Sequence, residues 1–173
     1  DKMKSKLSEE DRLLWLEVAE CFLRLNALGS VDRILGHPDL RGEKERARIQ
    51  AYAYMHDWRY EEAHFELQTY LQKAKSEDYF TWVAQVNELA CLVFLENAEE
   101  SVTLAQAIIP SLQERKYVRL LGNIFELLFQ LSLQNLDAPT MKSVEDLLLQ
   151  DLRPSGEKPQ ILEDMFLQKW KLL

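Results

Sequence analysis

The residues best suited to catalysis or metal binding are few: three histidines, His37, His56 and His64, and two cysteines, Cys21 and Cys91. His56 and His64 lie on either side of an expected turn between helices, so they could approach each other. Each cysteine lies among apolar residues, and no Cys or His spacing fits a zinc site. We therefore expect two buried, unpaired thiols in a reducing compartment, and histidines at helix ends or on the surface.

Neighbouring acids offer the residue types of general acid–base catalysis at Glu61-Glu62 and Glu99-Glu100. Both pairs fall in the first turn of an expected helix, where the helix dipole favours negative charge without any catalytic role. The chain has no glycine-rich phosphate loop, no GxSxG and no HExxH motif. We therefore expect no enzyme activity, no metal and no cofactor.

The charge balance restricts the partners. The chain has 21 Lys and Arg against 29 Asp and Glu, a net charge of -8, which is the wrong sign for binding nucleic-acid phosphates. The one basic stretch contains Arg41, Lys44, Arg46 and Arg48, and the acids Glu43 and Glu45 interrupt it. We therefore interpret it as a solvated face. No apolar run approaches the ~18 residues of a membrane span. We expect a cytoplasmic protein with no direct nucleic-acid contact and no membrane contact.

The elements that position these residues are helices. The 173 residues include only 5 Gly and 5 Pro, and no segment alternates with the two-residue period of a strand. Apolar residues recur instead at helical spacing. We expect helix starts at Ser8, Asn97 and Asp137, and we expect Asp57 to cap the helix that begins at Trp58. Pro110 predicts a kink or an early helix end near Ile109.

Nine helices are expected in one domain, 1–173. They form four antiparallel pairs and a single last helix, at about 9–36, 43–75, 78–115, 117–152 and 159–172. A break at Arg153–Gly156 precedes the last helix. Because the chain begins with Asp and not Met, we expect it to be a fragment of a longer protein.

The pairs repeat with a period of 34 to 39 residues, from starts near 9, 43, 78 and 117. The second pair places small and aromatic residues at fixed offsets: Ala51, Tyr54, Tyr60, Ala63 and Leu67. The first pair has similar residues at the matching offsets: Trp15, Ala19, Phe22, Val31 and Leu35. This pattern resembles the tetratricopeptide (TPR) repeat, although Trp58 stands where that family usually has Gly. The resemblance implies an all-α solenoid, a right-handed superhelix whose first helices line a groove for a peptide or partner helix.

Candidate binding residues follow from helix geometry. Arg48, Tyr52 and Met55 are spaced by four and three, so they share one side of the expected helix, while Tyr54 takes the packing side. Arg, Tyr and Met are favoured in recognition surfaces, so we predict that this trio faces the groove.

Four further partner-binding candidates are Glu126, Gln130, Phe166 and Trp170. The last two lie in the expected C-terminal helix, which either caps the array or docks into another molecule. We therefore expect a scaffold that binds a protein or peptide, such as an adaptor, chaperone or regulatory module, with a homodimer possible. The alternative is an effector-sensing or oligomerisation domain of a transcription regulator.

Overall fold

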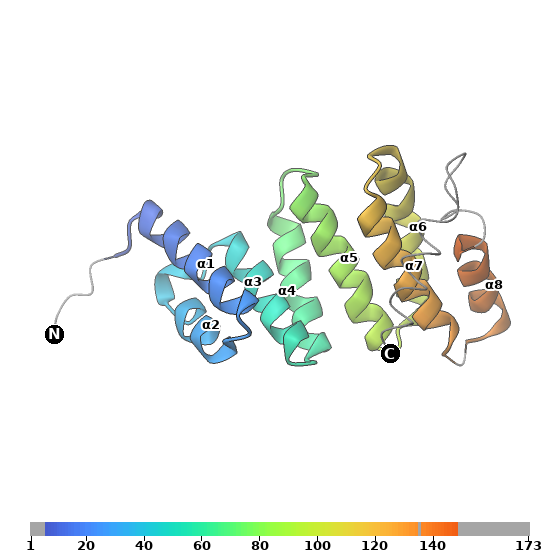
Figure 1. Cartoon of the computed structure of the whole chain (residues 1–173), viewed down its shortest axis with the longest axis horizontal. Helices are drawn as coiled ribbons and strands as arrows, with labels where there is room; N and C mark the ends of the chain where they lie inside the picture. Colours follow the sequence, from blue (N-terminus) through green and yellow to red (C-terminus); the bar gives the residue numbers. More distant parts are fainter. Residues whose placement is uncertain (1–5, 135, 149–173) are drawn as a thin grey trace. The chain divides into compact units, whose positions relative to one another are not determined.

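A computed structural model describes residues 6–134 and 136–148 of the chain. These residues form eight α-helices and one short 3-10 helix, η1, with no strand among them (Figure 1). The helices are α1 (Glu9–Arg24), α2 (Leu28–Leu35), α3 (Lys44–His56), α4 (Tyr60–Lys73), α5 (Tyr79–Phe94), α6 (Ala98–Glu114), α7 (Val118–Ser132) and α8 (Ala138–Asp146), with η1 (Pro38–Leu40) between α2 and α3. The all-α prediction is confirmed. The expected ninth helix, 159–172, lies outside the described residues.

The helices form two compact units. Unit 1 ends at Glu77 and contains α1 to α4, and unit 2 begins at Asp78 and contains α5 to α8. In each unit, helices that follow one another in sequence pack antiparallel. These neighbour contacts are consistent with the expected helix pairs.

Unit 1 is built on small residues where helices approach closely. Helix α1 packs against α2 and α3, and α3 packs against α4. Ala19, Ala51 and Ala63, which the repeat pattern places at close contacts, are fully buried. Ala19 belongs to an apolar cluster of unit 1 that also contains Leu16, Leu23, Val31, Leu35, Leu40, Ile49 and Ala53.

Unit 2 has a larger apolar core. Helix α5 packs against α6 and α7, and α8 packs against α6 and α7. The fully buried side chains at the centre of the core are Leu89, Ile109, Leu112, Ile124, Leu128 and Leu131.

Three predicted helix starts are confirmed and one is wrong. Ser8 forms a capping box with Asp11, and the side chains of Asn97 and Asp137 each accept a backbone N–H at the start of their helices. Asp57 is instead the C-cap of α3, which ends at His56. Helix α4 begins after Arg59, and no side chain caps it. Asp57 cannot cap α4 because the turn places two more residues before that helix begins.

The tight turns share one backbone conformation. Residues Asn26, Trp58, Glu96 and Lys116 all have φ between 55° and 59°, in the left-handed region. Each lies two residues beyond its helix. At Glu96, the backbone N–H donates to the carbonyl of Val93, and the next N–H donates to Leu92, which is the Schellman pattern. Trp58, where the sequence pattern led us to expect Gly, is therefore in left-handed backbone with a bulkier side chain.

Helix α6 continues through Pro110 to Glu114, so an early end near Ile109 is wrong, while the alternative of a kink stays a prediction. Pro110 is exposed, whereas Ile109 and Leu112 are buried in the core of unit 2. Burial on both sides of the proline stabilises the helix against the lost hydrogen bond.

Candidate functional site

Arg48, the first residue of the predicted trio, lies inside unit 1. Its side chain joins α3 to α1, because Nη2 lies 2.9 Å from Glu20 Oε2 and Nε lies 2.7 Å from Glu45 Oε2. Only 8% of Arg48 is exposed. The interpretation of residues 41–48 as a solvated face is therefore wrong at Arg48.

The electrostatics of this cluster shift the pKa values of Arg48 and Glu20 so that their charged forms are favoured. Burial by itself lowers the pKa of Arg48, but hydrogen bonds from its guanidinium to Glu45 and Glu20 outweigh burial and raise the pKa. Burial likewise raises the pKa of Glu20, but hydrogen bonds from Arg48 and Arg24 outweigh it, so the net pKa lies below its ordinary value. The guanidinium of Arg48 therefore serves as an internal tie between two helices.

The other members of the trio are half-buried. The ring of Tyr52 packs on the apolar cluster of unit 1, and the Arg48 guanidinium carbon lies 5.7 Å from its centroid. Tyr54 is also half-buried, with the Arg59 guanidinium 4.3 Å from its ring. The structure thus brings Arg48 and Tyr52 together as predicted from the spacing, while partner binding at Tyr52 and Met55 stays a prediction.

Of the four other candidates, two lie on α7 and two lie in the expected last helix. Glu126 and Gln130 are both exposed on α7. Phe166 and Trp170 lie outside the described residues.

The two thiols differ, and the prediction that both are buried is wrong for Cys21. Cys91 is buried in α5, and burial, together with the nearby charge of Glu88, raises the pKa of its thiol to about 12. Cys21 is exposed because the buried face of α1 is formed by Leu16, Ala19 and Leu23. Cys21 lies on the opposite side of that helix.

The three histidines lie on different elements of unit 1. His37 Nδ1 accepts the backbone N–H of Asp39 at the start of η1, and its ring lies 5.5 Å from that of Trp15. His56 ends α3, and His64 is half-buried on α4. Across the described residues, no three His, Cys, Asp or Glu side chains are grouped so that they could hold a metal ion. No described helix is long and apolar enough to cross a membrane.

Unit 2 has an aromatic surface that sequence reasoning missed. Helices α5 and α7 pack together, and each begins with large apolar side chains. We call Tyr79, Phe80, Tyr117 and Val118 the aromatic edge. The rings of Tyr79 and Tyr117 meet edge to face with their centroids 5.4 Å apart, and Phe80 is 56% exposed.

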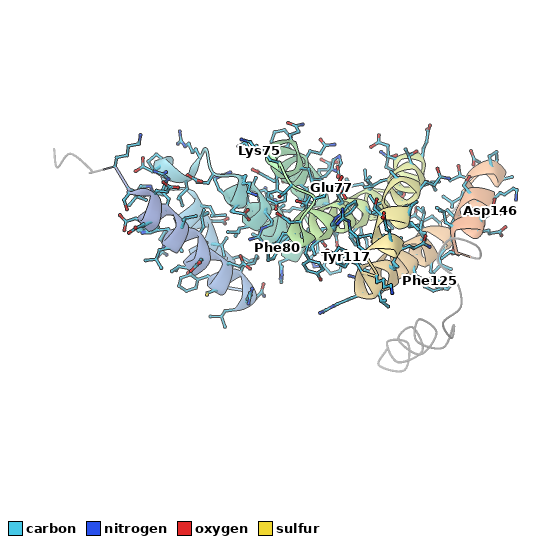
Figure 2. The ribbon with its side chains drawn as sticks, turned by 90° about the horizontal axis from the view of Figure 1, so that it is seen from above. Lys75, Glu77, Phe80, Tyr117, Phe125 and Asp146 are labelled. Atoms are coloured by element: carbon cyan, nitrogen blue, oxygen red, sulfur yellow. The ribbon has the colours of Figure 1, made fainter. Side chains whose placement is uncertain are left out.

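This surface continues along α7, where Val118 and Phe125 are seven residues apart and so share a face. Figure 2 shows Phe80, Tyr117 and Phe125 on the same side of unit 2. The aromatic residues at the two helix starts are visible in the sequence. Only the packing of α5 beside α7 makes them one surface.

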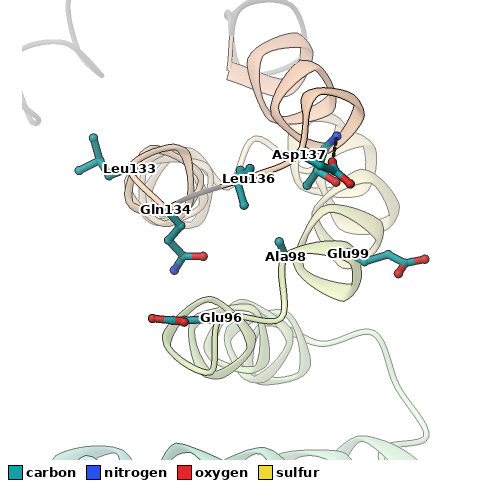
Figure 3. A pocket seen from close by; sticks show the side chains of 8 residues that line it. Glu96, Ala98, Glu99, Leu133, Gln134, Leu136 and Asp137 are labelled. Atoms are coloured by element: carbon teal, nitrogen blue, oxygen red, sulfur yellow. Dashed lines mark hydrogen bonds between the residues drawn. The ribbon is translucent and has the colours of Figure 1, made fainter.

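Unit 2 also has a hollow of about 900 Å³ at the α5–α6 and α7–α8 turns (Figure 3). It is lined by Glu96, Ala98, Glu99, Leu133, Gln134, Leu136, Asp137 and Thr140. Three of its polar residues, Gln134, Asp137 and Thr140, make hydrogen bonds within the fold. The Gln134 amide donates to the Val93 carbonyl at 2.9 Å, and Asp137 accepts the Thr140 N–H at 2.8 Å. We therefore assign this hollow no chemistry.

Comparison with known proteins gives no match: no family model, no curated protein and no solved structure is similar to this chain.

Proposed function

We propose that this chain is a helical-repeat module that binds a protein or peptide segment, and that its helix pairs are TPR-like. The observation that carries the proposal is the aromatic edge of unit 2. Rings and a valine that are partly open to solvent gather there from two adjacent helices. Contiguous exposed apolar surface rimmed by polar residues is typical of interaction sites, and aromatic residues are enriched in their centres.

The charges around the aromatic edge favour a particular ligand. Lys116 and Arg119 are exposed and lie immediately on either side of Tyr117 and Val118. A peptide with an apolar side chain next to an acidic one would bury the first against the rings and pair the second with these cations. The net charge of the chain, -8, repels acidic partners elsewhere, so such a peptide would be directed to this edge.

The predicted binding residues on α3 and α7 are additional contact areas in this proposal. Glu126 and Gln130 lie on the same helix as Val118, about 80° and 120° around it, so any contact they make with a partner lies beside the edge. Tyr52 and Met55 offer a second, half-buried contact area in unit 1.

The experiment selects ligands from a random peptide library displayed on phage, with the whole chain as bait. The tightest peptide is synthesised, and its affinity is measured by fluorescence anisotropy. Phe80→Ala and Val118→Ala should each weaken binding about tenfold or more, which is ~1.4 kcal/mol. Tyr52→Ala tests the second area in the same assay.

Leu133→Ala is the matched control, because Leu133 is an exposed apolar residue of unit 2 outside the aromatic edge. It should leave the affinity unchanged. Selection of no peptide, or of peptides whose binding ignores Phe80 and Val118, would contradict the proposal.

A further inference from the structure

Helix α1 carries an apolar stripe on its solvent side. Leu14 and Val18 of α1 and its C-cap residue Leu25 are 58%, 39% and 75% exposed, and Cys21 is exposed between them. At about 100° per residue, these four side chains fall within about 60° of one another on the helix. The buried residues of α1 lie on the opposite side.

The spacing of the stripe is that of a coiled-coil seam. The steps from Leu14 to Val18, Cys21 and Leu25 are four, three and four residues, so these residues take positions d, a, d and a of a heptad. Such a seam packs against another helix with the same spacing.

The flanks of the seam indicate which helix that is. One flank, position e, is apolar, with Trp15 and Phe22. The other flank, position g, is charged, with Glu17 followed by Arg24, whose side chain is 77% exposed. In an antiparallel pair of helices, flanks of the same letter face each other.

We infer that α1 is the interface of a symmetric homodimer, with α1 of a second copy packed antiparallel on this seam. In that register Val18 faces Cys21 of the second copy, and Leu14 faces Leu25. Glu17 then lies opposite Arg24, and Trp15 lies opposite Phe22. The two-fold axis repeats each contact, so the stripe, its charges and its rings are all self-complementary.

A parallel pair does not satisfy the same residues. There position g faces position e, so Glu17 would lie against Phe22 and lose solvent without gaining an opposite charge. One helix from each copy makes a small interface, so we expect a dimer in the micromolar range.

Sedimentation equilibrium of the whole chain tests for the dimer. Val18→Glu should raise the dissociation constant at least tenfold, because it places two carboxylates near the two-fold axis. The control is Leu133→Glu, which makes the same change of charge at an exposed leucine of unit 2. Circular dichroism checks that both variants keep their helices.

Charge exchange tests the register. Glu17→Arg and Arg24→Glu should each prevent self-association, because each variant places like charges at both contacts between the charged flanks. Mixed together, the two variants should form a heterodimer, because the two arginines of one chain at positions 17 and 24 then face the two glutamates of the other. A structural effect of either substitution within one chain would not be reversed by mixing.

Cys21 supplies an independent readout. Its reaction with a thiol reagent should slow as the protein concentration rises through the dissociation constant, while Val18→Glu keeps the reaction fast. The inference is overturned if the wild-type chain stays monomeric at about 100 µM, an order of magnitude where weak interfaces are populated. It is also overturned if a dimer forms that ignores Val18→Glu, or if the charge variants do not pair. Those results would leave the seam to a different occupant, such as another segment of the chain.

Discussion

Unit 1 and unit 2 hold their helices together with different chemistry. In unit 1 the buried guanidinium of Arg48 reaches from α3 to the Glu20 carboxylate of α1, beside a modest apolar cluster. In unit 2 the helices meet over large aliphatic side chains such as Leu89, Ile124 and Leu128. A charged tie has an optimum pH and a strict geometry, whereas apolar packing depends on volume. The two units should therefore respond differently to the same kinds of perturbation.

Their exposed surfaces differ as well. The stripe on α1 in unit 1 is flanked by one acid and one base, Glu17 and Arg24, which suits an identical copy. On its α7 side, the aromatic edge of unit 2 is flanked by the cations Lys116 and Arg119, which suits an acidic ligand. We therefore propose the stripe on α1 for self-association and the aromatic edge for a foreign partner.

The largest expected effect is in the core of unit 2. Leu128→Ala removes a fully buried side chain and leaves a cavity, which should cost about 2–5 kcal/mol of unfolding free energy. Urea unfolding measures the loss. Because Cys91 is buried in the same unit, its labelling should also accelerate. Leu133→Ala, at an exposed site, should stay within about 0.5 kcal/mol of wild type. Equal costs for both variants would show that Leu128 is not part of the core.

In unit 1 the corresponding test removes the tie. Arg48→Ala leaves Glu20 and Glu45 without their shared cation, which should lower the free energy of unfolding by about 1.5–3 kcal/mol. The loss is limited because both carboxylates are partly hydrated and regain water. Arg24→Ala deletes the exposed cation on the other side of Glu20 and should cost about 0–1 kcal/mol. Urea unfolding of both variants compares them. An Arg48→Ala variant as stable as Arg24→Ala would mean that Arg48 is a surface residue, as the sequence alone indicated.

Much of the fold could be predicted from local sequence. Caps at Ser8, Asn97 and Asp137 act within one helical turn, so their residue types suffice to place helix starts. Small residues at Ala51 and Ala63 mark close helix contacts because only they fit there. The prediction that Asp57 caps α4 is wrong because residue type alone does not distinguish the start of a helix from its end, and Asp is also accepted at the end of α3.

The surfaces were less predictable because they depend on tertiary packing. Helix α1 has apolar residues on most of its circumference, so periodicity did not show that Cys21 faces solvent. Nothing in the residues around Arg48 shows that Glu20, on another helix, accepts its hydrogen bond. The aromatic edge joins residues from two helices that are distant in sequence, and a search helix by helix does not find it.

A smaller effect concerns pH and unit 1. The pKa of Glu20 is lowered in the folded state, so its contribution to stability is present above the ordinary value of 4.5 and is lost as pH falls through the folded pKa. Glu20→Gln should therefore be less stable than wild type at neutral pH, by less than the cost of Arg48→Ala. The two proteins should become equal in strong acid. Urea unfolding of both across the acid range measures the difference. A difference that stays constant with pH would show that the Glu20 charge does not contribute.

The smallest expected effect compares the same turn in the two units. Trp58 in unit 1 and Glu96 in unit 2 both hold left-handed backbone, with φ of 59° and 58°, where a side chain is strained and glycine is not. Glu96→Gly should stabilise the chain by about 0.5–1 kcal/mol in urea unfolding. Glu96→Ala, which keeps a Cβ, should give no such gain. Trp58→Gly should gain less than Glu96→Gly, because it also removes the contact of the indole with the Tyr60 ring, 6.3 Å away edge to face. If glycine destabilises both turns equally, backbone strain is not what distinguishes these positions, and the bulky residues stabilise the turns through contacts of their own.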